Sequence, residues 1–364
     1  MTVRFGLSVP NRGVVIGARN PKDLVAMCEV ADASELFDAV FTGDNLISKP
    51  RIDAIVFLSL VAGRTRRVTL GTACMASFVF RHPIVLANQW GALDLLSDGR
   101  TLLVACIGGG PDTRRGPPSP SGAKWETEFA AMGMPVAERV GRMVEGMAIL
   151  RALWTGEAVT HHGRFYRFED VRLHVTPVQQ PCPIAIASNP RPPHADATTI
   201  DRALRRVGEL GDGWQVEMST PEEFGERWAR IRAHARAAGR IPLPDTSMIH
   251  FYVNVQDRSQ AAFDEARRFY EAYHVGTFPE DYLRWRLVTG TPAEVTERLA
   301  GFLDAGCTLP ILRFASWDPM GQMRRAMATV LPALREHADR LPAPMLGFGE
   351  VVSAPPSRCD RERV

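Results

Sequence analysis

The feature that most constrains the fold is a regular alternation of short apolar runs and longer helical patterns along the chain. The runs predict eight strands, at Val3–Val9, Ala39–Thr42, Val68–Ala73, Thr101–Ile107, Pro183–Ala187, Gly213–Val216, Met248–Val255 and Pro310–Phe314. The helical patterns that follow most of them are Pro21–Leu36, Asp53–Arg64, Pro83–Ser97, Ala137–Trp154, Thr198–Leu210, Pro221–Ala238, Ser259–Tyr273 and Pro292–Ala305. Eight β/α units favour parallel strands that close into an α/β (β/α)8 TIM barrel. The alternative is an open doubly wound sheet, whose usual Gly-rich first turn does not occur here.

The chain has 364 residues, which fits a single barrel with insertions better than a bare one. We therefore expect one domain over residues 1–340. Three segments exceed the repeat: 108–135 after the fourth strand, 155–183 before the fifth, with alternating apolar residues typical of a short β excursion, and 273–290 after the seventh helix. The first of these is a candidate lid. The Pro-rich stretch 341–364 is expected to be an irregular tail.

Composition excludes several classes of function. The net charge of +2 gives no basic footprint for nucleic acid. The six cysteines form no C-x-x-C and the histidines form no H-E-x-x-H, so we expect no metal site and no disulfide framework. The N-terminus leads directly into a strand pattern, and no apolar run reaches the ~18 residues of a membrane span. The expected location is the cytoplasm.

In a TIM barrel the functional residues lie on the loops that follow the strands. Asp44, after the second strand, is a candidate for polarising a ligand, although composition alone favours a role in capping its own turn. His82 is a candidate acid, or it opens the next helix. Arg313, at the end of the eighth strand, could bind a phosphate or form an ordinary ion pair. No nucleophile–base arrangement is recognisable, which favours a cofactor that carries the chemistry.

Several longer stretches resemble one family. They are 68–73, 81–87, 93–100, 138–145, 149–154 and 211–214. Over about residues 3–334 the chain is similar to the bacterial luciferase-like monooxygenase superfamily of flavin- or F420-dependent oxidoreductases. The resemblance implies a barrel, usually dimeric, with reduced FMN or F420 at its C-terminal mouth. It also implies that the ring lies at the end of the third strand, where a non-proline cis peptide can occur between Ala73 and Cys74.

The resemblance implies a role for each candidate site residue. Asp44, Asn45 and His82 would orient the ring or substrate, and Ala73, Cys74, Ile107 and Gly108 would line the ring. Ser188, Asn189 and Arg313 would hold the phosphate end.

Many F420-dependent members carry Asp-His where this chain has Asp44-Asn45, and Asn cannot act as a general acid. The leading hypothesis is therefore a monooxygenase that uses reduced FMN, supplied by a separate flavin reductase, and O2 on a small organic substrate. The alternatives are F420-dependent hydride transfer and a flavin-binding protein without turnover.

Overall fold

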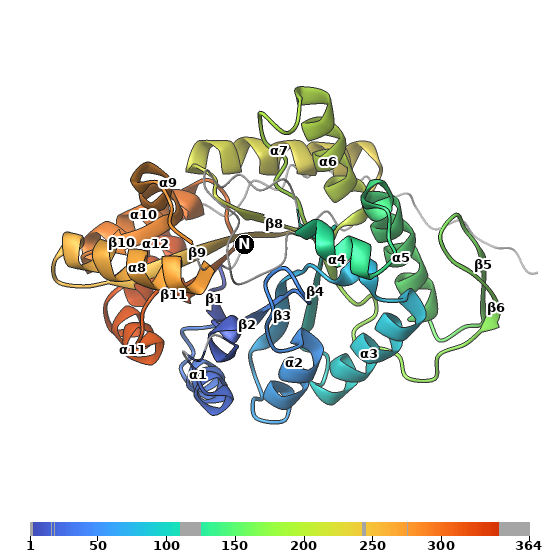
Figure 1. Ribbon diagram of the computed structural model, residues 1–364, viewed down its shortest axis with the longest axis horizontal. Coiled ribbons are helices and arrows are strands. Elements are labelled where there is room, and N and C mark those ends of the chain that lie inside the picture. The colour runs from blue at the N-terminus through green and yellow to red at the C-terminus, as the bar shows by residue number, and fades with distance from the viewer. Residues whose placement is uncertain are drawn as a thin grey trace, which may run out of the picture.

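The computed structural model describes residues 3–15, 17, 19–109, 125–241, 245–274 and 276–341. In Figure 1 the strands lie at the centre of the molecule and most helices surround them. The strands are β1 (Gly6–Val9), β2 (Ala39–Asp44), β3 (Thr69–Met75), β4 (Thr101–Ala105), β5 (Val159–His162), β6 (Arg167–Val171), β7 (Ile184–Ala187), β8 (Gly213–Glu217), β9 (Thr246–Val255), β10 (Leu287–Gly290) and β11 (Leu309–Phe314).

Eight of these strands form a closed parallel barrel in the order β1-β2-β3-β4-β7-β8-β9-β11. Pairing of β1 with β11 and of β8 with β9 closes the ring. The TIM-barrel prediction is confirmed, and each of the eight expected runs overlaps one barrel strand. The expected excursion before the fifth barrel strand is the antiparallel hairpin β5–β6, which Figure 1 places beyond α5 (Arg139–Leu153).

The helices pack against the outer face of the barrel, and several begin at a capping side chain. Asn20, Asp53, Asp196, Thr220 and Thr291 each accept a backbone N–H of the helix that follows. Besides α5, the helices are α1 (Pro21–Ala33), α2 (Ala54–Ala62), α3 (Pro83–Leu96), α4 (Trp125–Ala131), α6 (Ala197–Leu210), α7 (Pro221–Ala237), α8 (Ser259–His274), α9 (Glu280–Arg286), α10 (Pro292–Asp304), α11 (Pro319–Thr329) and α12 (Leu331–Arg340), with three short 3-10 turns at Asn11–Val14, Phe78–Phe80 and Val136–Glu138.

The segment after the seventh helical pattern contains regular structure that the sequence did not reveal. Residues 280–286 form α9, and β10 pairs in parallel with the second half of β9. This pairing is possible because β9 has ten residues and extends past the end of β8. The predicted lid over 108–135 lies partly outside the described residues; the described part includes α4. Apart from Leu341, the predicted tail over 341–364 also lies outside them.

The barrel interior is filled by a cluster of its own beneath the mouth. Its members come from the inward positions of the strands: Ala39, Phe41, Ala73, Leu102, Val104, Ala185, Met248, Leu309 and Ile311. Phe41 occupies the centre because its neighbouring strands carry glycine. A Cβ at Gly6 would lie 2.8 Å from the Phe41 ring, and one at Gly71 would lie 2.5 Å from it. The Phe41 ring therefore fills the barrel interior directly below the mouth.

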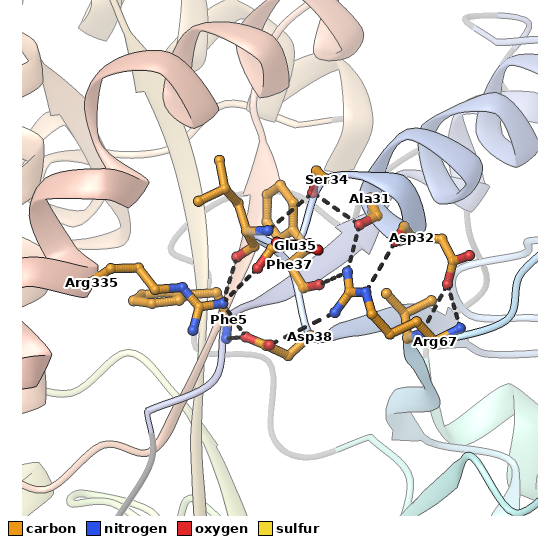
Figure 2. Close-up of polar contacts among 11 residues, drawn as sticks. Phe5, Ala31, Asp32, Ser34, Glu35, Phe37, Asp38, Arg67 and Arg335 are labelled. Carbon is orange, nitrogen blue, oxygen red and sulfur yellow. Dashed lines mark hydrogen bonds and ion pairs between the residues drawn. The ribbon is translucent and has the colours of Figure 1, made fainter.

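Polar side chains close the opposite, N-terminal end of the barrel (Figure 2). Asp38 accepts the backbone N–H of Phe5 at 2.8 Å and pairs with Arg335 at 2.7 Å. Arg67 donates to the backbone carbonyls of Ala31 and Asp32. Packing at this end of a TIM barrel contributes to stability, whereas function lies at the C-terminal mouth. No helix within the described ranges is long and apolar enough to cross a membrane.

Candidate active site

The C-terminal mouth of the barrel has one wall of small residues. It comprises Ala73 and Cys74 from β3, Cys106 directly after β4, and Ala187 from β7; we call this the small wall. Ala73 belongs to the interior cluster, and Cys74 and Ala187 pack against it. Small side chains allow a flat ligand to approach the backbone closely. The peptide bond between Ala73 and Cys74 is cis, as the family resemblance implied.

The two thiols of the small wall are hydrogen-bonded to each other across neighbouring strands. This bond raises the pKa of Cys74 and lowers that of Cys106, so the Cys106 sulfur carries the greater thiolate character. Burial raises the pKa of Cys182 and of Cys307 to about 12. Of these four cysteines, Cys106 alone has a lowered pKa.

The opposite wall is polar and charged. It consists of Ser8, Glu217, His250, Tyr252 and Arg313, from β1, β8, β9 and β11; we call this the polar wall. Arg313 donates to Ser8 Oγ at 2.7 Å and to the Tyr252 hydroxyl at 3.0 Å. His250 Nε2 is hydrogen-bonded to Ser8 Oγ at 3.1 Å. All of these side chains except Glu217 are buried.

The residue Arg286 joins the polar wall from the end of α9. Its guanidinium donates to the His250 carbonyl oxygen at 3.0 Å and pairs with Glu217 at 3.0 Å. It also lies 4.7 Å from the centre of the Tyr252 ring. Burial would lower the pKa of Arg286, but Glu217 and the tyrosines raise it further than burial lowers it. The guanidinium therefore stays charged.

The histidines of the polar wall are neutral. Burial lowers the pKa of His250 well below 6.5, and Arg313, Arg286 and Arg51 lower it further by charge repulsion. His274, whose Nε2 lies 2.9 Å from the Tyr252 hydroxyl, is lowered in the same direction by burial and by neighbouring cations. The two histidines therefore add no positive charge to that of the neighbouring arginines and Lys49.

The three predicted catalytic residues take different places. Asp44 is buried, accepts the Ser77 N–H at 2.7 Å and lies 3.7 Å from Arg81. Burial raises its pKa. Asn45 donates to Ser48 Oγ at 3.3 Å, within the loop after β2.

His82 is exposed and caps α3 by accepting the Ile84 N–H, while its ring packs edge-on against Tyr166. The structure does not bring His82 together with Asp44 and Asn45. The catalytic roles of these three residues remain predictions.

The predicted phosphate ligands are also separated. Asn189 donates to the Glu217 carbonyl oxygen and accepts from Arg191, which keeps it in the loop after β7 together with Ser188. Arg313 lies on β11, and β8 and β9 stand between β7 and β11 on that side of the barrel. Gly108 has φ of +80°, and a Cβ there would lie 3.2 Å from the Phe129 ring. With Ile107, it continues the small wall beyond β4.

Sequence reasoning missed several residues of the polar wall. His250 and Tyr252 alternate with apolar residues over Ile249–Val253 of β9, a signal for polar side chains that face the barrel interior. Glu128, on α4, was also missed, although its carboxylate accepts the N–H groups of Leu46 and Ile47 and organises the loop after β2. Among the described residues, no group of three or more His, Cys, Asp or Glu side chains could hold a metal ion.

Three buried polar atoms of the barrel interior have no hydrogen-bond partner: Gln215 Oε1, His250 Nδ1 and Arg313 Nε. Buried polar atoms in proteins are normally paired, so unpartnered ones at one site indicate a polar ligand or water. The mouth therefore combines a wall of small residues on one side with unpartnered polar atoms on the other.

Comparisons with known proteins agree with this geometry. A family model described as luciferase-like monooxygenase matches residues 3–282. An F420-dependent glucose-6-phosphate dehydrogenase of Amycolatopsis mediterranei is 30% identical over 86% of this chain and 95% of its own length. One from Beutenbergia cavernae is 26% identical over 86% and 94%.

Solved structures show the same fold. The monooxygenase RslO1 from Streptomyces bottropensis superposes with a TM-score of 0.71 at 24% identity, covering 92% of this chain and 99% of its own. An F420-dependent secondary alcohol dehydrogenase in complex with an F420-acetone adduct has a TM-score of 0.73 at 16% identity, with the same coverage. A monooxygenase and an F420-dependent dehydrogenase therefore share the fold of this chain.

Proposed function

The chain belongs to the luciferase-like monooxygenase family, and we propose that this oxidoreductase binds reduced FMN at the mouth of its barrel and uses O2 to oxygenate a small organic substrate. The observation that carries the proposal is the opposition of the small wall to a polar wall with two buried guanidinium groups, Arg286 and Arg313. Fixed positive charge next to a redox ring stabilises the negative charge that develops when O2 is reduced.

The small wall would receive the ring. Ala73, Cys74, Ile107 and Gly108 would line it, and Ser188 and Asn189 would lie toward the phosphate end. When bound, reduced FMN supplies the electrons for O2 activation, and the buried interior beneath it keeps water away. Asp44 would hold the loop that borders the ring, through its contact with the Ser77 N–H. A separate reductase would supply the reduced flavin, and we expect a homodimer.

A second candidate function is F420-dependent hydride transfer. It is favoured by the curated relatives, whose names specify F420-dependent dehydrogenases and which cover most of the chain. Against it stands Asn45, whose amide hydrogen-bonds within its own loop and cannot donate a proton as a general acid. The two candidates differ in cofactor and in the need for O2, so binding and oxygen consumption separate them.

The first test is a titration of the purified protein with FMN, reduced FMN and F420, followed by addition of air in the presence of a substrate panel. We expect reduced FMN to bind more tightly than F420 and O2 to be consumed with incorporation of one oxygen atom into a product. Tight binding of F420 without binding of reduced FMN would contradict the proposal. Binding of reduced FMN with no product from any substrate would favour a binding protein instead.

A variant of the small wall tests the position of the ring. Ala187→Phe places a phenyl ring at the end of β7, where the side chain packs against the interior cluster at the mouth. We expect the Kd for the cofactor to rise about 100-fold, equivalent to about 2.8 kcal/mol. Ala187→Ser is the matched control and should bind as the wild type does. An unchanged Kd for Ala187→Phe would place the ring elsewhere.

A further inference from the structure

The side chain of Arg313 is buried without a negatively charged partner. It is 3% exposed, and its two hydrogen bonds go to the neutral hydroxyl groups of Ser8 and Tyr252. Its guanidinium carbon lies 5.4 Å from the ring centres of both Tyr252 and Tyr273. Within the part of the chain that the structure describes, no carboxylate lies at ion-pair distance from Arg313. Its Nε has no hydrogen-bond partner at all.

Burying a charge is costly unless a counter-ion and hydrogen bonds compensate it. The same wall shows how compensation is normally achieved, because Arg286 pairs directly with Glu217. Glu217 is also the acid whose charge reaches Arg313, and its side chain is 49% exposed. One half-exposed carboxylate thus faces two buried guanidinium groups, and Arg51 adds positive charge near His250. Arg313 keeps its charge, because Tyr273, Tyr252 and Glu217 raise its pKa more than burial lowers it, but among the described residues it has no ion-pair partner.

We propose that the substrate carries an oxyanion, such as a carboxylate, sulfonate or phosphate ester, and that the polar wall centred on Arg313 binds it. Oxygenation of this substrate rests on the proposed function, whereas binding of an anion at Arg313 does not depend on it. A planar fork of N–H donors is suited to oxyanions, and the stacked tyrosines hold the guanidinium rigid. Neutral His250 adds an unpartnered Nδ1 to the same wall.

The cofactor phosphate is the other source of an oxyanion, and the layout of the barrel argues against it. The phosphate candidates Ser188 and Asn189 follow β7, whereas Arg313 lies on β11 and contacts β1 and β9. An anion bound at Arg313 would therefore lie three strands around the barrel from Ser188 and Asn189. We therefore assign the anion that neutralises Arg313 to the substrate and not to the cofactor.

The test measures thermal unfolding of the cofactor-free protein in sodium sulfate and in sodium chloride of equal ionic strength. Sulfate should raise the Tm of the wild type, and Arg313→Gln should lose this shift. Arg325→Gln, which removes an arginine paired with the exposed Asp257, is the matched control and should keep it. The same sulfate shift in Arg313→Gln and wild type, or in neither, would overturn the proposal.

The ligand-free variants give a second readout. In chloride, Arg313→Gln should unfold at the same temperature as the wild type or higher, because an uncompensated buried charge has been removed. A structural arginine would behave in the opposite way, so a clearly lowered Tm would contradict the proposal. Arg313→Lys keeps the charge and should keep part of the sulfate shift; complete loss of the shift in this folded variant would also contradict it.

Flavins distinguish the two sources of the anion. If Arg313 binds the substrate, Arg313→Gln should leave the ratio of FMN to riboflavin affinity unchanged, and sulfate should still raise the Tm of the FMN-saturated protein. If sulfate competes with FMN and the variant lowers that ratio, Arg313 holds the cofactor phosphate and the proposal is wrong. If no flavin binds, the proposed function fails, while the sulfate shift of the cofactor-free protein still decides the anion site.

Discussion

The arginines at the two ends of the barrel differ in burial and in their partners: Arg67 is exposed and Arg335 half-buried, whereas Arg313 is buried. At the N-terminal end, Arg335 binds the carboxylate of Asp38 and the backbone carbonyls of Glu35 and Leu36 (Figure 2). Arg67 at the same end donates to backbone carbonyls and lies 3.9 Å from Asp38. At the C-terminal mouth, Arg313 has only neutral hydroxyl partners. The arginines at the N-terminal end are paired with acids or carbonyl groups of the protein, whereas Arg313 at the mouth has no acidic partner in the described part of the chain.

This difference distinguishes residues that stabilise the fold from residues that are available to bind a ligand. Polar groups that find all their partners in the chain need nothing further, and their removal leaves unsatisfied groups behind. A buried cation without a counter-ion lowers the stability of the free protein, which is tolerable where a ligand supplies the missing charge. The comparison therefore predicts opposite consequences for substitutions at the two ends.

The largest stability effect is expected at the N-terminal end. Asp38→Ala leaves the buried Phe5 N–H without its acceptor and removes the partner of Arg335. We expect the free energy of unfolding to fall by about 3 kcal/mol. Asp257→Ala removes an exposed carboxylate paired with Arg325 and should cost less than about 0.5 kcal/mol. Urea denaturation measures the free energy of unfolding of both variants. Similar losses in the two would contradict a special contribution of Asp38 to stability.

The next effect concerns the mouth and depends on pH. Because the pKa of His250 is lowered in the folded protein, the unfolded chain takes up a proton below about pH 6.5 that the folded chain refuses. Stability is therefore complete above that pH and falls as the pH is lowered. His250→Gln removes this contribution, about 1.4 kcal/mol between pH 8 and pH 5.5.

Urea denaturation of wild type and His250→Gln across this range measures the difference in slope. His274 and the carboxylates titrate in both proteins, so their contributions cancel in the comparison. The wild type should lose stability more steeply than the variant as the pH falls. Parallel curves would show that the pKa of His250 is the same in the folded and the unfolded protein, and the charge of the polar wall would then have to be revised.

Much of the barrel was predictable because its strands are buried on both faces. Such strands appear as continuous apolar runs, and the observed ends of β2, β3 and β7 lie within two residues of the predicted ones. The strand β10 was not predictable, because its four residues pair only with the part of β9 that extends beyond β8. A strand that depends on the length of a distant neighbour leaves little local signal.

The site was predictable only in part. The rule that function follows the strand ends selected Asp44, Ala73, Cys74 and Arg313, all of which border the mouth. It also selected His82, which lies at the start of a helix and caps it. His250 lies within a strand, and Arg286 comes from a segment without a strand pattern. Their contact with Glu217 is a property of the closed barrel, which no local pattern contains.

The cysteines repeat the contrast between the two ends and give the smallest predicted effect. Cys182 and Cys307 precede β7 and β11 at the N-terminal end, where burial raises their pKa to about 12, whereas Cys106 at the mouth has a lowered pKa because Cys74 hydrogen-bonds to its sulfur. Iodoacetamide should therefore label Cys106 before Cys182 and Cys307, as followed by peptide mass mapping.

Cys74→Ala removes the hydrogen bond and should slow labelling of Cys106 about threefold, equivalent to about 0.7 kcal/mol. Faster labelling of Cys182 or Cys307 in the folded protein would contradict the assignment of reactive sulfur to the mouth, and bound cofactor should protect Cys106 if the ring rests on the small wall.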